Sequence, residues 1–494
     1  MQNSVNQFLK NFVLVSWIVV FSGEVFSATG ELDIAIPDDL DVLLDTTPKS
    51  KSLFGGYIKN ETSYRYDEPR SFTKIRSILS LNWQYQFSQN FKFYSSGWGY
   101  YDSVYNLFDY DTIAAREVRN DKEPLVFLEQ LEQEKDEQRI ELREFYMDMY
   151  FDNLDIRVGK QYVVWGVLEG IRIVDEVNPM DFRELILPEL LDYRIPLWTL
   201  KINYFTDKTK FEFLFIPELK FHQPASSGSE WELFQVLDTT TEPKSFNPKF
   251  SEYGFKVSRE IFGSEISLSY FYTWDDYPTS FRIISLSDVQ STEPTQVLPI
   301  FPTYTRMHMF GSTFVKEIQG NILKAEFAYV KNKYFAIVDK YTNGFLDDDG
   351  EVQLDHIRWG IGYDFSFWGA DFSPAIAQWA ILGYKDYVLT SQFDTTFNLF
   401  IRKPIQKYSA VFTMLLIRLI TFEETYVRPR ITFNLTDRFQ ITAGMDYFVG
   451  RRTAFGRQAD SSAAGGLVTP EQRAQFLGNF NENKRVSLEF RYNF

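Results

Sequence analysis

The sequence predicts an all-β protein, namely a transmembrane antiparallel up-and-down β-barrel of about 18 strands. Three observations predict this fold: an aromatic-rich composition, strands that alternate between apolar and polar residues, and connections that alternate between short and long. Aromatic residues make up 18% of the 494 residues, with 48 Phe and 29 Tyr, and such residues favour a pleated, half-buried surface. The mean hydropathy of -0.26 excludes a bundle of apolar helices, but it suits a barrel in which only alternate residues face lipid.

The C-terminal segment is the clearest predicted strand. Every second residue from Val486 to Phe494 is apolar, and a period of two is the pattern of a strand with two different faces. The residues that alternate with them are polar: Arg485, Ser487, Glu489, Arg491 and Asn493. A strand of this kind that ends in Phe494 resembles the signal read by the outer-membrane barrel-assembly machinery, which implies that machinery as a partner. An amphipathic strand of a soluble β-sandwich is the alternative.

The same alternation recurs along the chain and predicts the strand order. The predicted strands are 54–66, 71–87, 91–105, 140–151, 154–165, 196–205, 209–217, 249–260, 263–275, 302–317, 321–333, 352–368, 371–384, 387–402, 406–421, 424–435, 438–450 and 484–494. Tight turns such as Asp152-Asn153, Phe262-Gly263 and Lys403-Pro404 alternate with mostly long connections. Single-chain outer-membrane barrels have short periplasmic turns and long outer loops, so both chain ends are predicted to lie in the periplasm. Sixteen strands is an alternative, because the breaks within 371–421 are weak.

Three segments are predicted along the chain. Residues 1–27 form a signal peptide, since Lys10 precedes an apolar run over 12–21 that is too short for the roughly 20 residues of a membrane-spanning helix; cleavage after Ala28 is an alternative to cleavage after Ser27. Residues 28–51 form an acidic periplasmic segment, which is either a tail or a piece folded into the lumen. Residues 52–494 form the barrel, with an inserted loop over 166–195, and a helix is predicted over 124–139.

Composition and motifs argue against several classes of function. The net charge of -16 argues against nucleic-acid binding, which needs a basic face. The absence of cysteine excludes disulfides and thiol catalysis. Only three histidines are present, and none lies in a catalytic motif, so no enzyme and no cofactor are predicted. The sequence over 347–350 resembles part of a calcium loop, but Phe345 and His356 would stand at ligand positions, so no metal site is predicted.

The candidate functional residues lie where the predicted lumen meets the loop over 166–195. By alternation, charges of both signs face inward, which suits a wet channel. The loop combines many large apolar residues with charges, so we predict that it folds into the barrel mouth and narrows it; a lid across the outer rim is the alternative. After the break at Asn178-Pro179, Asp181 could cap a short helix that ends at Leu187. The candidate pore residues are Arg157, Glu169, Arg172, Asp175, Glu176, Asp181, Arg183, Arg358, Asp364, Arg428 and Arg430.

A run of motifs in this region resembles a known family. Gly159-Lys160-Gln161, Trp165-Gly166, Asp175 and Asn178-Pro179-x-Asp181 resemble a large proteobacterial family of outer-membrane β-barrels of unknown function, often encoded near RND-type permeases. The resemblance implies a porin-like channel in the outer membrane of a Gram-negative bacterium, passing small or hydrophobic solutes. Its implied partners are outer-membrane lipid and lipopolysaccharide, and a periplasmic or RND-type transport protein. The alternative function is a non-conducting scaffold or surface-binding barrel.

Overall fold

The structure, a computed structural model, describes most of the chain outside its N-terminus and several long connections. The described residues are 51–109, 112–113, 137–187, 192–225, 229–231, 240–282, 300–337, 351–388, 390–450 and 477–494. The predicted signal peptide and the segment 28–50 lie outside them, and so does most of the predicted helix over 124–139. No described helix is long and apolar enough to cross a membrane.

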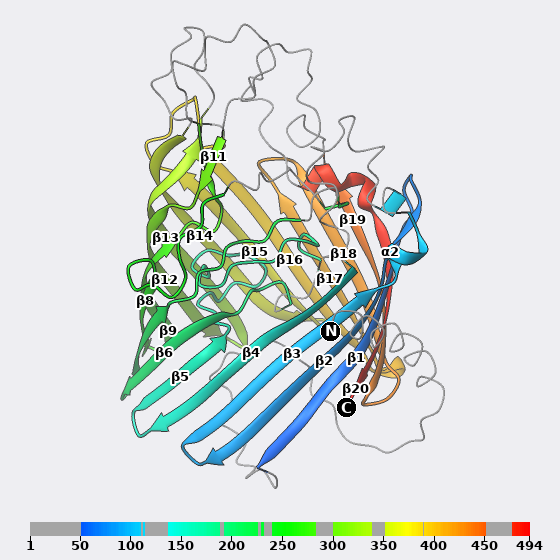
Figure 1. Cartoon of the computed structure of the whole chain (residues 1–494), viewed down its shortest axis with the longest axis horizontal. Coiled ribbons are helices and arrows are strands. Elements are labelled where there is room, and N and C mark those ends of the chain that lie inside the picture. Colours follow the sequence, from blue (N-terminus) through cyan, green and yellow to red (C-terminus); the bar gives the residue numbers. More distant parts are fainter. Residues whose placement is uncertain are drawn as a thin grey trace, which may run out of the picture.

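The described part of the chain forms a closed antiparallel β-barrel of 18 strands (Figure 1). Each strand pairs with the next along the chain, and the sheet closes because β1 pairs with β20. Closure leaves no strand edge unpaired. The strands are β1 (Ser52–Arg65), β2 (Ser71–Ser88), β3 (Phe91–Asp102), β4 (Gln138–Phe151), β5 (Leu154–Gln161), β6 (Leu197–Thr206), β7 (Thr209–Ile216), β8 (Glu252–Ile261), β9 (Ser264–Trp274), β12 (Arg306–Ile318), β13 (Asn321–Ala336), β14 (Glu351–Phe367), β15 (Ala370–Ile381), β16 (Phe393–Ile405), β17 (Ala410–Leu419), β18 (Glu424–Asn434), β19 (Phe439–Val449) and β20 (Arg485–Asn493).

Most of the short elements outside the wall lie at one end of the barrel. A separate hairpin of β10 (Thr279–Arg282) and β11 (Ile300–Thr303) rises from the connection between β9 and β12. The helix α2 (Val104–Leu107) and the 3-10 helix η5 (Leu477–Asn483) lie in the connections after β3 and before β20. The 3-10 helix η3 (Gln406–Tyr408) instead belongs to a short turn at the opposite end. The end that carries the long connections is called the long-loop end, and the other the short-turn end.

The predicted fold is confirmed, including the strand number, and the 16-stranded alternative is wrong. The predicted turn at Lys403-Pro404 is also wrong, because both residues lie in β16, paired with Phe412 and Val411. The turn follows at Gln406–Ser409, where Ser409 takes the left-handed conformation that closes it (φ 46°). The strand predicted over 154–165 ends at Gln161, because the chain there leaves the wall. The break between β15 and β16 is longer than predicted and spans 382–392.

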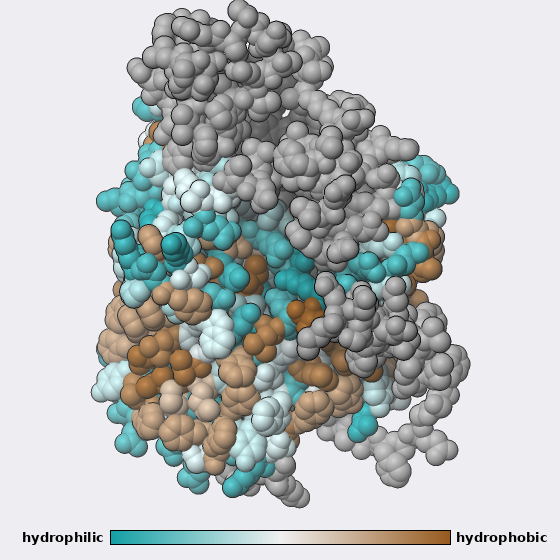
Figure 2. Space-filling model, in the orientation of Figure 1, coloured by the Kyte–Doolittle hydropathy of each residue, from teal (hydrophilic) through white to brown (hydrophobic). Residues whose placement is uncertain are grey.

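Alternation along each strand separates an outer apolar face from an inner face. On β12, for example, Met307 and Met309 are buried inside the barrel, whereas Phe310 is 47% exposed on the outside. Exposed apolar residues gather on the lower part of the wall, toward the short-turn end, with hydrophilic residues above them (Figure 2). The outer face therefore suits lipid, as the period-two pattern predicts.

Candidate functional site: the inner loop and the cavity beside it

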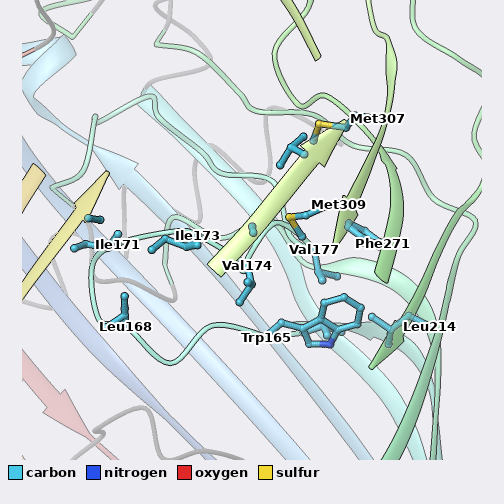
Figure 3. Packing of buried hydrophobic residues seen from close by; sticks show 14 of the residues in the cluster. Trp165, Leu168, Ile171, Ile173, Val174, Val177, Leu214, Phe271, Met307 and Met309 are labelled. Carbon is cyan, nitrogen blue, oxygen red and sulfur yellow. The ribbon is translucent and has the colours of Figure 1, made fainter. Parts of the chain in front are cut away.

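The described parts of the connection between β5 and β6, residues 162–187 and 192–196, run inside the barrel and are called the inner loop (Figure 1). Its first part carries apolar side chains that are fully or nearly fully buried. They pack on inward-facing side chains of the barrel wall, from β7, β9 and β12 among other strands (Figure 3). The residues of the loop in this cluster are Val163, Trp165, Leu168, Ile171, Ile173, Val174 and Val177. Burial of this apolar surface is the main force that holds the loop in the lumen.

Glycines of the wall provide the space for these side chains. A Cβ built on Gly360 of β14 would lie 2.5 Å from Cδ1 of Ile173, and one on Gly311 of β12 would lie 2.8 Å from Cγ1 of Val174. Such contacts are too close for carbon atoms, so a larger residue at either position would force the facing side chain, or the loop that carries it, to shift. The wall and the loop are therefore complementary in shape as well as in polarity.

One buried carboxylate fixes the backbone of the inner loop. Glu326 of β13 faces into the barrel and is 3% exposed. Its Oε1 accepts hydrogen bonds from the backbone N–H groups of Val167 (2.5 Å) and Leu168 (2.7 Å), and its Oε2 accepts one from Val174 (3.1 Å). Three donors on one carboxylate satisfy backbone groups that would otherwise be buried without partners. Glu326 is thus a positioning residue for the loop.

Ion pairs continue the attachment toward the middle of the loop. Arg358 of β14 donates to Glu176 at 2.6 Å, and Arg194 lies 2.5 Å from Asp175. Burial alone would raise the pKa of Glu176, but Arg358 and Arg172 outweigh it and lower that pKa to about 2. Glu176 is therefore ionised at neutral pH, and its charge is matched by wall and loop arginines.

The second part of the loop crosses to the other side of the lumen. Lys74 and Arg76 of β2 both contact the carboxylate of Glu184. Leu185 and Leu187 are buried in a second apolar cluster, which also includes Tyr426 and Phe448 of the wall and residues of η5. The inner loop therefore spans the barrel and is attached to the wall on both sides.

The helix predicted after Asp181 is absent, because residues 183–186 form turns instead. The side chain of Asp181 accepts from the backbone N–H of Arg183 at 3.2 Å, as a cap would, but it also pairs with the side chains of Arg183 and Arg139. The backbone N–H of Phe182 donates a hydrogen bond to the carbonyl of Gln223, in the connection between β7 and β8. Contacts with neighbouring segments therefore override the local helical signal.

A cavity remains beside the inner loop, between residues 181–187 and 192–193 of the loop and the inner face of β1, β2, β3, β18 and β20. It is called the side cavity, and together with its open mouth it holds about 1180 Å³. Its lining is charged and aromatic, with residues of both signs. The wall contributes Tyr57, Lys59, Glu61, Lys74, Arg76, Trp98, Tyr100, Arg428, Arg430, Arg485 and Glu489, and the connections contribute Asp181, Arg183, Glu184, Asp192, Tyr193 and Trp231.

The structure brings together only some of the candidate pore residues. Asp181, Arg183, Arg428 and Arg430 line the side cavity. Four others lie in the buried contact between the loop and the wall: Arg172, Asp175, Glu176 and Arg358. The remaining three lie apart from the cavity in local pairs: Arg157 with Asp148, and Glu169 and Asp364 with Lys324.

Sequence reasoning missed several residues that shape the site. Lys59 and Glu61 of β1 form an ion pair of 2.7 Å at the cavity, but Asn60 and Thr62 interrupt the apolar face of β1, so the alternation is weak there. Glu326 did carry a signal, because it is a lone carboxylate in the otherwise apolar run Ala325–Val330. The wall glycines Gly311 and Gly360 carry none, because their role depends on the loop that they face.

The three histidines have separate structural roles. His222 accepts a hydrogen bond at Nδ1 from the backbone N–H of Met180 (2.9 Å), which requires an unprotonated nitrogen. Burial, aided by Arg172, lowers its pKa well below the usual value, so the ring is neutral. His356 contacts Arg358, and His308 contacts Tyr270. Within the described ranges, no group of three or more acidic or histidine side chains is arranged to hold a metal ion.

Comparisons with known proteins give one family match. A family model described as protein of unknown function (DUF1302) matches residues 64–379. No curated protein matches this chain significantly. Among solved structures, the chain is similar to OccAB4 of Acinetobacter baumannii (TM-score 0.47, 7% identity, covering 90% of this chain and 98% of that one). It is also similar to OccK8 (OprE) of Pseudomonas aeruginosa, with a TM-score of 0.44 and 10% identity over 90% of this chain and 98% of that one.

Proposed function

This chain belongs to the DUF1302 family of proteins of unknown function, whose model matches more than half of it, and we propose that it is a porin-like channel of the Gram-negative outer membrane. The observation that carries the proposal is the side cavity, which lies between the inner loop and one part of the barrel wall. Small solutes would pass along this cavity, and the inner loop would form the constriction. A barrel of 18 strands is wide enough for an aqueous path beside a folded loop.

The charged lining of the side cavity favours small polar solutes over the hydrophobic solutes that the family resemblance also implies. The wall presents basic side chains and also the carboxylates Glu61 and Glu489 to the cavity. The inner loop presents acidic side chains together with Arg183. Charges of both signs along a narrow path would favour polar solutes. Aromatic side chains such as Trp98 and Trp231 would give their apolar parts a surface to contact.

The channel proposal is tested by single-channel recordings in planar bilayers. The intact chain should conduct, and deletion of residues 167–194 should enlarge the conductance. Lys59→Gln removes a positive charge from the cavity, so it should shift the ion selectivity toward cations. Lys210→Gln is the matched control, because Lys210 of β7 pairs with Glu212 at 3.6 Å outside the cavity. Absence of conductance in both the intact and the loop-deleted protein would overturn the proposal.

A second candidate function, a non-conducting scaffold, is favoured by one observation. The inner loop is attached on both sides of the lumen, through Glu326 on one side and through Leu185 and Leu187 on the other. The scaffold predicts no solute flux through the intact chain in liposome-swelling assays, whereas the channel predicts flux that rises when the loop is removed.

Localisation and partners belong to the same proposal. A signal peptide over 1–27 would export the chain, and the barrel-assembly machinery would insert it by recognising the strand that contains Phe494. A periplasmic or RND-type transport partner would meet the short-turn end of the barrel. Lipid and lipopolysaccharide would cover the outer face.

A further inference from the structure

The outer face of the barrel carries a cluster of basic residues near the long-loop end, called the outer basic patch: Lys249, Arg306, His308 and Lys331. On β12, Arg306 and His308 share the outward face with Phe310, since the residues between them are buried inside. Lys331 of β13 is directly opposite His308 in the sheet. Basic groups on a lipid-facing surface are costly unless something compensates their charge.

Aromatic rings hold the patch in place. The guanidinium of Arg306 lies 4.1 Å from the ring centre of Trp274 and 4.5 Å from that of Tyr272, both on β9. The same guanidinium donates to the backbone carbonyls of Phe250 and Ser251, just before β8. Cation–π contacts of this kind fix the position of the charge. Arg306 therefore contributes a positive charge at a defined height on the wall.

The other three basic groups keep their donors available. His308 uses Nδ1 in a contact of 2.9 Å with the hydroxyl of Tyr270, and its Nε2 has no hydrogen-bond partner among the described residues. Lys249 and Lys331 are exposed, and the ammonium of Lys249 lies 5.7 Å from the ring centre of Phe250. A nearby carboxylate, Asp355 of β14, accepts hydrogen bonds from the hydroxyl of Tyr329 and from the backbone N–H of Asn332. The patch is thus positively charged overall.

The height of the patch on the barrel wall points to the kind of ligand that would meet it. Toward the short-turn end, the outer face of the same strands continues into exposed apolar residues, including Phe255 (44%), Leu268 (64%), Phe310 (47%) and Phe327 (43%). Apolar residues of this kind contact acyl chains, and aromatic residues mark the level of the headgroups. Basic groups at that level meet lipid phosphates. We propose that the outer basic patch binds the phosphate groups of a phosphorylated glycolipid in the outer leaflet.

This inference rests on the proposed outer-membrane location but not on conduction, so the two can fail separately. The test is binding of diphosphoryl lipid A to the purified barrel in detergent, counted by native mass spectrometry. The double variant Lys249→Gln/Lys331→Gln should weaken binding by roughly ten- to thirty-fold, because each basic group near an anionic lipid surface contributes a few-fold. Both residues are exposed, so the variant should fold normally.

The matched control is Arg259→Gln/Lys316→Gln. These residues lie on the outward face of β8 and β12 as well, but near the short-turn end, and their loss should leave lipid A binding unchanged. Equal weakening by both double variants would overturn the site. Equal occupancy by diphosphoryl lipid A and by a lipid A without phosphates would overturn the role of phosphate. Binding of inorganic phosphate alone that displaces lipid A would overturn the assignment to a lipid.

Discussion

At the scale of single residues, a few carboxylates determine where the inner loop lies. Glu326 holds backbone N–H groups at one end of the loop, Glu176 pairs with a wall arginine, and Glu184 pairs with two basic residues of β2. Each is mostly buried, so the loss of its charge leaves basic groups or backbone donors without compensation. Of the three, the sequence predicted only Glu176 as a site residue, because partners from distant strands cannot be paired by sequence alone.

The attachment of the loop tip through Glu184 should depend on pH. Burial raises the pKa of Glu184, but Arg76 and Lys74 outweigh it and lower the pKa to about 2, from 4.5. Because the docked pKa is the lower one, the contribution to docking is complete above about pH 4.5 and is lost as the pH falls toward 2. Hydrogen exchange of residues 182–187, corrected for the intrinsic rate, should therefore stay slow from pH 7 to about 5 and speed up below that.

Glu184→Gln is the control for this pH dependence. Removal of one partner from a buried ion pair costs about 3 kcal/mol, so the variant should show fast exchange of 182–187 at pH 7 already. Its exchange, corrected for the intrinsic rate, should change less between pH 7 and 3 than that of the parent protein. If the parent protein and the variant showed the same pH profile, Glu184 would not be the group that makes docking of the loop depend on pH.

At the scale of elements, the inner loop and the wall depend on each other. The sequence predicted that the loop segment would enter the barrel, because its apolar residues need a buried surface. It could not predict which strands receive the loop, since the inward apolar residues of β7, β9 and β12 are typical of any buried wall. The role of the wall glycines Gly360 and Gly311, which leave space for Ile173 and Val174, emerges only from the docked loop.

A methyl group on Gly360 should displace the loop. The Cβ of Gly360→Ala would lie 2.5 Å from Cδ1 of Ile173 and 2.8 Å from Cδ1 of Leu168, and overpacking of this kind costs roughly 1–3 kcal/mol. Thermal unfolding should show the loss of stability. Ile173→Val removes the nearest carbon, so the double variant should recover part of the loss, as a double-mutant cycle would show. Strictly additive effects would contradict the contact.

At the scale of the whole molecule, the fold was predictable and the path through it was not. Strand number and order follow from alternation and from connection lengths, which are local properties of the sequence. The side cavity depends instead on which inward residues come together after closure, for example Glu489 of β20 paired in register with Glu61 of β1. It also depends on where the loop crosses. These long-range contacts explain why four of the predicted pore residues line the cavity and the other seven do not.

The orientation of the barrel in the membrane is the remaining property of the whole molecule, and the absence of cysteine makes it measurable. Phe262 and Trp368 lie in turns at the short-turn end and are 96% and 84% exposed, whereas Leu107 and Phe246 lie in long connections and are each 63% exposed. Short turns face the periplasm in outer-membrane barrels. Single cysteine variants at Leu107 and Phe246 should therefore react with a membrane-impermeant maleimide on intact cells.

Cysteines at Phe262 and Trp368 should react only after the outer membrane is made permeable. Their greater exposure makes them the more reactive pair in detergent, so slow labelling on cells would reflect the membrane and not burial. Labelling of all four positions in detergent controls for accessibility. The opposite pattern on cells, with the cysteines at Phe262 and Trp368 labelled first, would mean that the barrel is inserted in the opposite orientation. In that orientation the outer basic patch would lie at the inner leaflet. The lipid that it binds would then have to be a phospholipid of the periplasmic side.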